Sequence, residues 1–448
     1  MAGQKILSQD DIQKLLNIEG TSDDDMDYQS IEEESSSEGD NESAASEVSD
    51  YDSENFSDTE ATAESERPIS FLSHLRSNHT SYDVLWSQLY GPPIFRATMG
   101  LKRFKYLLAF IRFDDKATRS VRRQKDKFAP IREVWERLNT NFKKHYLPGS
   151  NITVDEQLIP YRGKCPFKQY MPSKPDKYGM KVWWACDSET FYPLNSLPYL
   201  GKEGGERALP GLGRRVVQQL TEPYQKTNRN VTCDNYFTDM ELAQNLLSNG
   251  LTLVGTVRKN KGFIPVTFQA NKSREVGSSL FGFTANSTLV SYVPKMRRSV
   301  VLLSTMHHSN TVMEDVNTKP EIINHYNSTK GGVDSLDQLV HAYMCKRRTN
   351  RWPFAFFMNG LDVSGVAACV VWMNTHPNWN ADKHYSRRLF IQSVSESLVQ
   401  VHIERRSNLG RVVSGEDTEG KEREYRSLLQ SLWDEFWASG EGVEKEQD

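Results

Sequence analysis

Four aspartates have spacings that would let their carboxylates bind metal ions together. Asp334 and Asp337 lie three residues apart in GGVDSLDQ. Asp155 lies in TVDEQL and Asp234 in VTCDNYF. Carboxylate oxygens are the ligands that hard cations such as Mg²⁺ prefer, and two such ions can activate an attacking oxygen and stabilise a leaving oxygen in phosphoryl transfer. Three or four converging carboxylates suit that task, and without a metal they would repel one another.

Each acid also has an explanation that involves no chemistry. Asp155 is predicted in mid-strand and Asp234 at a strand end, where acids often form turns or cap helices. Asp334 falls in the first turn of a predicted helix, where a negative charge stabilises the positive end of the dipole. Asp337 adjoins the apolar stripe of that helix and is explained less well. His341, on the same face, is predicted to be a surface or core histidine rather than a ligand.

The elements that must position these acids follow from the periodicity of the chain. Residues 68–150 are predicted to be helical. Strands are predicted at NITVDEQL and NRNVTCD, on either side of a hairpin at Lys181–Gly201 and a helix. A helix and a strand complete residues 151–264, a β-rich insertion occupies 265–318, and helices resume at 319–376. This order is typical of an α/β fold with a ribonuclease H-like mixed sheet, in which two strand acids and a helix acid can converge at one edge.

The charge of the chain is divided along its length. Residues 1–67 hold 21 Asp and Glu against three Lys and Arg, and residues 412–448 hold 11 against four. The remainder, 68–411, therefore carries about +21 and ends in a basic helical segment at 377–411. The N-terminal tail is predicted to be disordered, and the C-terminal tail to contain one amphipathic helix. Acidic tails beside a basic body indicate that the body binds a polyanion.

Cysteine usage and hydropathy exclude several other classes. The five cysteines form no CxxC pair, so no zinc site is expected and a reducing compartment is favoured. The N-terminus lacks the apolar core of a signal peptide. The most apolar run, Phe354–Met373, is interrupted by Asn359, Asp362 and Ser364. It is predicted to be a buried core helix, and no membrane contact is expected.

Longer motifs make the sequence similar to the piggyBac transposase family. They are TVDEQLIPYRGKCPFKQYMPSKPDKYGMKVW, CDSETFYPLNSLPYLG, NVTCDNYFTDMELAQNLL, VGTVRKNKGFIP, and YNSTKGGVDSLDQ with CKRRTNRWP, in order from about Tyr82 to His376. The resemblance implies a ribonuclease H-like core with a β-rich insertion. It also implies a DDD/D catalytic and metal-binding set, which maps onto Asp155, Asp234, Asp334 and Asp337.

The same resemblance implies the activity and its partners. The expected reaction is cut-and-paste DNA transposition at TTAA targets, with Mg²⁺ as cofactor and Mn²⁺ as an alternative. The expected partner is DNA, as transposon ends and target, in the nucleus, and the resemblance suggests a homodimer.

Basic residues near the motifs are expected to hold DNA phosphates. They are Arg258, Lys259 and Lys261 after a core strand, Lys295, Arg297 and Arg298 in the insertion, Lys346, Arg347, Arg348 and Arg351 after the acid-bearing helix, and Arg122, Arg123, Lys125 and Lys127 in the helical region. Trp352 could stack on a base or anchor the core. Charge runs of this kind are otherwise solvated faces.

Two departures from the family keep other functions open. The helical region at 68–150, which in relatives serves DNA binding and dimerisation, is shorter here. No cysteine follows Cys369, whereas many relatives end in a zinc-binding domain that recognises transposon ends. The intact acids favour an active transposase. A transposase-derived DNA-binding or chromatin protein, a decayed copy, and a metal-dependent nuclease without strand transfer remain alternatives.

Overall fold

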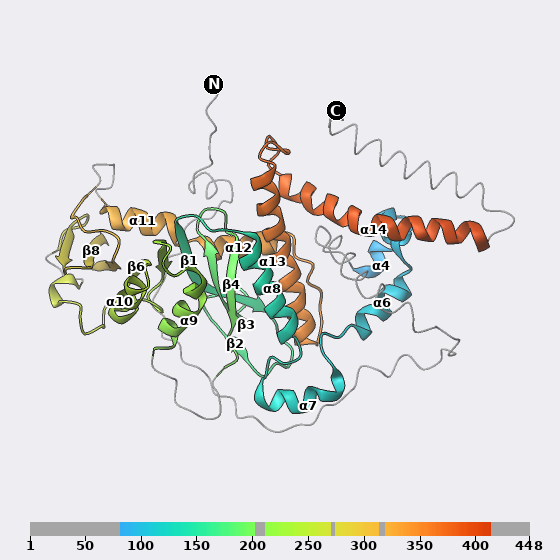
Figure 1. The fold of residues 1–448 in the computed structure, drawn as a ribbon, viewed down its shortest axis with the longest axis horizontal. Coiled ribbons are helices and arrows are strands. Elements are labelled where there is room, and N and C mark those ends of the chain that lie inside the picture. Colours follow the sequence, from blue (N-terminus) through green and yellow to red (C-terminus); the bar gives the residue numbers. More distant parts are fainter. Residues whose placement is uncertain (1–80, 202–210, 270–273, 313–318, 414–448) are drawn as a thin grey trace. The chain divides into compact units, whose positions relative to one another are not determined.

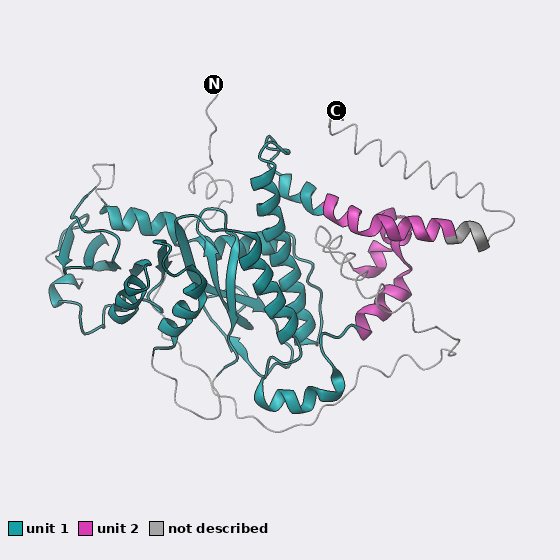
Figure 2. Ribbon diagram, in the orientation of Figure 1, with its two compact units in different colours: residues 1–56, 75–77, 111–391 teal, residues 57–74, 78–110, 392–448 magenta. Residues whose placement is uncertain are grey.

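The computed structural model of the chain describes residues 81–201, 211–269, 274–312 and 319–413. The predictions made for the N-terminal acidic tail and for the C-terminal amphipathic helix lie outside these residues. The described residues divide into two compact units (Figure 2). Residues 111–391 hold the sheet, and residues 81–110 with 392–413 form a small helical unit.

A nine-stranded mixed sheet is the centre of the larger unit (Figure 1). Its strands are β1 (Asn151–Pro160), β2 (Lys168–Tyr170), β3 (Tyr178–Asp187), β4 (Pro193–Pro198), β5 (Asn230–Cys233), β6 (Thr252–Thr256), β7 (Ser279–Phe283), β8 (Thr288–Lys295) and β9 (Arg298–Ser304). Their order is β2-β3-β1-β5-β6-β9-β8-β7, and β4 pairs with β3. Strands β1, β5 and β6 run parallel, whereas β3 and β9 are antiparallel to their neighbours β1 and β6. The predicted mixed α/β sheet is confirmed.

The predicted hairpin is formed by β3 and β4, and an aspartate holds its turn. The Asp187 carboxylate accepts hydrogen bonds from the backbone N–H groups of Glu189 (3.0 Å) and Thr190 (2.8 Å). It also accepts one from the N–H of Gly149 (2.7 Å), just before β1. Such short-range bonds explain why aspartate is favoured in turns. They also fix the hairpin against the start of β1, the strand that carries Asp155.

Helices cover both faces of the sheet. The larger unit holds α7 (Lys116–Lys125), α8 (Arg132–His145), α9 (Leu212–Thr221), α10 (Met240–Ser248), α11 (Glu321–Thr329), α12 (Gly332–Ala342), α13 (Trp352–Thr375) and the first part of α14 (Ser386–Val413), with short 3₁₀ turns at Glu222–Tyr224 and Val266–Phe268. On one face, Trp135 of α8 packs edge-on against Trp184 of β3 with ring centroids 5.6 Å apart. On the other, the Asn195 side chain of β4 donates to the Leu220 carbonyl of α9 at 3.1 Å.

The apolar run after Arg351 is a core helix, as the sequence predicts. Within the described ranges, α13 alone is long and apolar enough to span a membrane, and 67% of its apolar window is buried in the protein. Two of its interrupting polar residues have partners outside the helix. Asp362 accepts from the backbone N–H of Cys345 (3.0 Å), and Asn359 donates to the Gln157 side-chain oxygen (3.1 Å). Satisfied buried polar groups of this kind fix one packing arrangement.

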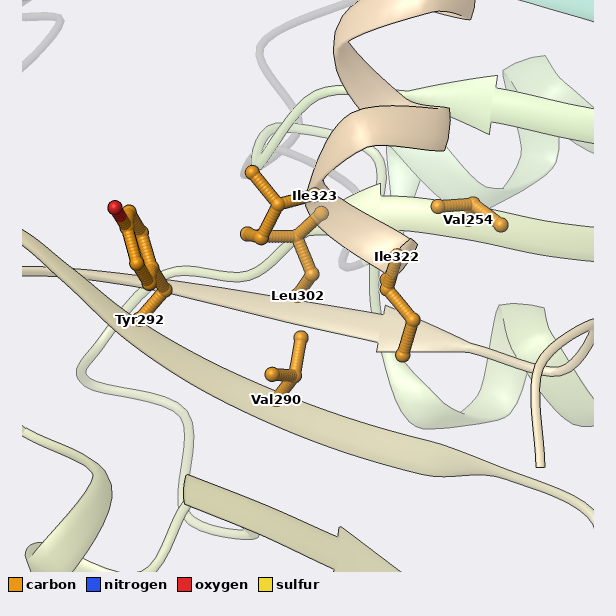
Figure 3. Close-up of a cluster of buried hydrophobic side chains, with 6 residues drawn as sticks. All are labelled: Val254, Val290, Tyr292, Leu302, Ile322 and Ile323. Carbon is orange, nitrogen blue, oxygen red and sulfur yellow. The ribbon is translucent and has the colours of Figure 1, made fainter. Parts of the chain in front are cut away.

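The strands of residues 265–318 extend the central sheet and do not form a separate one. Strand β9 pairs with β6 through Val254↔Ser304, Gly255↔Leu303 and Thr256↔Leu302. An apolar cluster joins these strands to α11 (Figure 3): Val254, Val290, Tyr292, Leu302, Ile322 and Ile323. Helix α11 is thereby fixed to the insertion at one end, and it leads directly into α12, which carries Asp334 and Asp337.

The smaller unit is built around aromatic side chains. It contains α4 (Tyr82–Leu85), α5 (Pro93–Thr98), α6 (Leu101–Phe110) and the second part of α14. Trp86 stacks on Phe104 with centroids 4.9 Å apart, and its indole N–H donates to the Met99 carbonyl at 2.8 Å. Arg406 of α14 donates to the Ala97 carbonyl at 2.6 Å. A pocket of buried aromatics with a satisfied indole is enough to hold these short helices together.

Candidate active site

The register of two parallel strands places the first two acids side by side. In β1 and β5, Val154 pairs with Cys233, and Asp155 and Asp234 are the next residues on the two strands. Neighbouring strands lie about 4.8 Å apart, so these two acids come together where β5 ends. Asp155 accepts from the N–H of Glu156 (2.7 Å), and Asp234 accepts from the N–H of Tyr236 (2.9 Å). Asp234 thus forms a turn as well as facing Asp155.

Hydroxyl groups and a glycine bring α12 onto the same two strands. The last residue of α11, Thr329, bonds through its backbone carbonyl to the Thr153 hydroxyl of β1 (2.5 Å) and through its own hydroxyl to that of Thr232 of β5 (2.8 Å). Gly332, the first residue of α12, then lies directly against β1. A Cβ atom at this position would lie only 2.6 Å from the Thr153 Oγ1 atom. Only glycine allows this approach, which brings Asp334 and Asp337 over Asp155.

Asp337 is held by a network whose hydrogen-bond directions are determined. The indole N–H of Trp184 can only donate, and it donates to the Gln157 Oε1 atom at 3.0 Å. Asn359 donates to the same oxygen, so the NH₂ group of Gln157 faces the other way and donates to Asp337 Oδ1 at 2.7 Å. The His341 Nδ1 atom lies 3.4 Å from the same Asp337 oxygen. The position of Asp337 is therefore fixed from β1 and from its own helix.

Asp334 is oriented by an ion pair with a lysine, whereas Asp155 and Asp234 accept hydrogen bonds from nearby backbone N–H groups. The Lys174 ammonium lies 3.8 Å from Asp334 Oδ1 and donates to the Glu156 backbone carbonyl at 3.3 Å. The Asp334 side chain is 61% exposed, and that of Lys174 is 22% exposed. On the opposite face of β1, the Lys181 ammonium lies 3.4 Å from Glu156 Oε2. It also lies over the Tyr236 ring, 5.1 Å from the centroid.

The pKa values of the acids show that their charges interact. The pKa of Asp155 is raised well above its usual range by burial first and then by the charges of Glu156, Asp234 and Asp334. Burial and Glu156 raise the pKa of Asp234 to about 6, against the Tyr236 N–H and Lys181. The pKa of Asp334 is raised by partial burial, opposed by Lys174, with Asp337 adding to the rise. Mutual destabilisation of this kind is what a bound cation would relieve.

Three residues of this site were missed by the sequence reasoning: Glu156, Lys174 and Lys181. Glu156 follows Asp155 in β1, where neighbouring side chains point to opposite faces, yet its charge raises the pKa of both Asp155 and Asp234. Lys174 lies in the loop Met171–Lys177, where no periodicity marks any side chain. Lys181 lies in β3, and its approach to Glu156 depends on strand register. The position of Lys174 between two prolines in PSKPDK is its one distinctive feature in the sequence, and it does not reveal the acids that the side chain meets.

The donor set of the site fits a hard divalent cation. The charges of Asp155, Asp234 and Asp334 interact where β5 ends, and carboxylate oxygens are the ligand chemistry of Mg²⁺ and Mn²⁺. Across the described ranges, no three Asp, Glu, His or Cys side chains are gathered closely enough to form a ready-made metal cage. The exposed Asp334 side chain is the member with most freedom to move onto a cation.

The predicted DNA-binding residues fall into an exposed group and a packed group. The exposed group is Arg258, Lys259, Lys295, Arg297, Arg298 and Arg348, with Lys261 half-buried. Arg258 lies beside the acids, because its Nε atom donates to Asn235 (3.3 Å), the residue after Asp234. In the helical region, Arg122 is engaged in an ion pair with Asp114 (2.6 Å).

The packed group corrects part of the prediction. Trp352 is 7% exposed, stacks on Phe128 with centroids 6.0 Å apart and meets Phe167 edge-on at 4.9 Å. It is a core anchor, so it has no free face for a base. The Lys346 ammonium donates to the Pro160 carbonyl at the end of β1 (2.5 Å), and Arg351 donates to the Ile111 carbonyl. Arg347 is half-buried and donates to the Lys346 carbonyl (2.9 Å). These contacts make much of the segment part of the fold.

Comparisons with known proteins show which chains this one is similar to. The family model described as Transposase IS4 matches residues 72–368. Human PiggyBac transposable element-derived protein 3 is 26% identical over 259 residues, which cover 51% of this chain and 41% of that protein. Human PiggyBac transposable element-derived protein 2 is 22% identical over 282 residues, which cover 58% and 46%. The match thus spans less than half of the length of either human relative.

A solved structure matches over more of the chain. It is the cryo-EM structure of a piggyBac transposase synaptic complex with hairpin DNA, with a TM-score of 0.72 and 36% sequence identity. The match covers 81% of this chain and 75% of that one.

Proposed function

The chain belongs to the piggyBac transposase family, and from that premise we propose that it cuts and joins DNA as a cut-and-paste transposase with a DDD/D site. The observation that carries this proposal is the convergence of Asp155, Asp234 and the α12 acids at one edge of the sheet. Helix-dipole stabilisation alone explains Asp334, but it does not explain why three chain segments bring their acids together. A site for metal-dependent phosphoryl transfer does explain it.

Family membership implies use of a divalent metal, and the acids here are suited to hold one. Asp155, Asp234 and Asp334 would be its principal ligands, with Asp337 adding its second oxygen, because Oδ1 is engaged by Gln157. Bound Mg²⁺ or Mn²⁺ supplies activation of an attacking oxygen and stabilisation of a leaving one. The chain itself contributes rigidity: Gln157 fixes Asp337, and the Thr329 bonds fix α12 over β1 and β5.

We also propose the partner and its setting. The matched structure is a complex with DNA, and this chain carries exposed basic residues near the acids, led by Arg258. These would hold the phosphates of transposon ends and of a TTAA target, while the acids act on one phosphodiester. The nucleus is the compartment where that substrate lies, and a homodimer would bring two transposon ends together.

An excision assay tests the proposed activity. A reporter plasmid would carry the element's own termini and be transfected with wild-type protein, Asp334→Ala or Glu222→Gln. Glu222 is an exposed acid in a 3₁₀ turn and serves as the matched control. We expect wild-type and control protein to excise the element and restore TTAA. Loss of an acid that acts on the reacting oxygens typically costs 10²-fold or more, so Asp334→Ala should give about 1% or less of wild-type excision.

Other outcomes point to the alternatives. Cut ends without rejoined TTAA or integrated product would identify a nuclease that lacks strand transfer. Nuclear retention on DNA with no excision by wild-type protein would identify a DNA-binding protein that keeps the transposase core. Equal excision by wild-type protein and Asp334→Ala would remove Asp334 from the chemistry.

A further inference from the structure

One lysine in a loop is placed among acids from two separate segments of the chain, β1 and α12. The loop Met171–Lys177 joins β2 to β3 and is closed on itself by hydrogen bonds. The N–H of Met171 donates to the Lys177 carbonyl (2.7 Å), and the N–H of Lys174 to the Met171 carbonyl (3.1 Å). Met171 is buried and Lys177 has a positive φ of 55°. The loop is therefore a built turn with a fixed tip.

Lys174 differs from every other side chain at the tip of this loop. Residues 172, 173, 175, 176 and 177 are exposed, whereas the Lys174 side chain is only 22% exposed. Lysine is rarely buried, because removing its ammonium from water is costly without a charged partner. Here the charged partner is the Asp334 carboxylate at 3.8 Å, and the backbone carbonyl of Glu156 accepts a hydrogen bond from the ammonium at 3.3 Å. The side chain thus turns away from solvent and toward the acid site.

The charges of the acids explain this orientation. Burial lowers the pKa of Lys174, but Asp155, Asp334, Glu156 and Asp337 together raise it above its ordinary value. The effect is reciprocal, because Lys174 lowers the pKa of both Asp155 and Asp334. The ammonium is a positive charge located where the carboxylates of β1 and α12 meet, as a bound metal ion would be.

We propose that Lys174 is the built-in counter-ion of the acid site, which holds Asp334 toward Asp155 in the metal-free protein and gives way to a divalent cation. Before metal binds, it offsets the repulsion among acids that the fold forces together. When a cation enters, the two positive charges compete for the same oxygens, so Lys174 limits metal affinity. It is a positioning residue, because it acts through Asp334. The inference rests on the proposed metal-binding role of the acids but not on transposition.

The test measures stability and metal binding in the full chain without DNA. The variants are Lys174→Met, which removes the charge at similar length, Lys174→Arg, which keeps it, and Lys177→Met as a control from the same loop. At pH 8 without metal, we expect Lys174→Met to lower Tm by about 2–4 °C. We expect Mn²⁺ to bind Lys174→Met roughly tenfold more tightly than wild type, because a positive charge near the cation is gone. Lys174→Arg and Lys177→Met should match wild type in both measurements.

A second substitution, Asp334→Asn, distinguishes a counter-ion role of Lys174 from a role in loop packing. In Asp334→Asn protein, the effect of Lys174→Met on the metal-free Tm should shrink, because the two side chains then no longer interact as charges. Lys174→Met that folds only with Mn²⁺ would support the proposal equally. An unchanged Tm and an Mn²⁺ affinity within twofold of wild type would overturn it. Equal destabilisation by Lys174→Met and Lys174→Arg would assign Lys174 to loop packing and also overturn it. The Tm and Mn²⁺ measurements do not depend on transposition, so they remain informative even if the protein does not excise the element.

Discussion

At the scale of single residues, the orientation of each acid depends on a neighbour that takes no part in chemistry. Gln157 can orient Asp337 only because Trp184 and Asn359 both donate to the oxygen of its amide. Asp234 is held by the Tyr236 N–H, and Asp334 by Lys174. Such supporting contacts decide whether carboxylates are within reach of one cation, because an error of 1 Å is costly in phosphoryl transfer.

His341 gives a pH-dependent prediction at this scale. Its hydrogen bond to Asp337, opposed by burial, raises the pKa of His341 to about 9. A histidine whose pKa is raised by folding stabilises the protein fully below its unfolded value of 6.5, and that contribution is lost as pH rises through about 9. The side chain is 37% exposed, so after allowance for solvent screening we expect about 1 kcal/mol.

Urea unfolding of wild type and His341→Gln would check this prediction. The two proteins should differ at pH 6 and converge at pH 10. A difference that stays constant across this range would show that the histidine charge does not act on Asp337. His376→Gln, at an exposed position after α13, is the control substitution.

The sequence points to the acids as candidates but not to the groups that hold them. Asp155 and Asp234 lie in strand patterns, Asp334 and Asp337 form a doublet behind two glycines, and the family resemblance maps the catalytic set onto these four residues. Lys174 could not be found this way, because its neighbours in space lie in β1 and α12 and its loop has no periodicity. For Trp352 the sequence left open whether the ring stacks on a base or packs in the core. The ring packs in the core against Phe128 and Phe167, which are distant in sequence. Local sequence patterns carry no information on such contacts between distant parts of the chain.

At the scale of elements, the start of α12 depends on the absence of one methyl group. Gly331 and Gly332 lie where α11 gives way to α12, and Gly332 has no room for a side chain against Thr153. Because the helix begins at this contact, a shift of its first turn moves both Asp334 and Asp337. The glycine therefore connects the packing of the helix to the geometry of the site.

Gly332→Ala is expected to harm activity more than stability. The added Cβ would lie 2.6 Å from Thr153 Oγ1, so α12 or β1 must move, at about 1–3 kcal/mol. Denaturant unfolding would measure this cost, and Mn²⁺ affinity would report the displaced acids. Gly100→Ala, where a Cβ would meet nothing within 4 Å, is the matched control. Unchanged metal affinity and stability in Gly332→Ala would show that α12 does not depend on this contact.

At the scale of the whole molecule, the described chain combines a sheet-based unit with a small helical one, and its charge is unevenly spread. The mixed sheet was predictable because strand and helix patterns alternate clearly. That the insertion strands continue the same sheet was not, because pairing of β9 with β6 joins residues about fifty positions apart. The basic residues were predicted to contact DNA. Some of them instead make contacts that hold the fold together.

Two substitutions separate these roles. Arg258→Ala removes an exposed charge beside Asp234, so DNA affinity should fall and the slope of log K against log salt should decrease by about 1, with Tm unchanged. Trp352→Ala removes a buried aromatic and should cost about 3–5 kcal/mol of stability. Salt titrations of DNA binding and chemical denaturation would measure the two effects. If Trp352→Ala lost DNA affinity but kept full stability, Trp352 would have to be assigned to the DNA-binding surface.

The pairing of β9 with β6 also limits which deletions the protein can tolerate. Loss of the segment from β7 to β9 would leave the edge of β6 with a row of unpaired backbone N–H and C=O groups, and would uncover Ile322 and Ile323 of α11. Exposed edges of this kind template aggregation between chains. A change of one acid would therefore affect only the proposed chemistry, whereas loss of these three strands would leave an edge prone to aggregation.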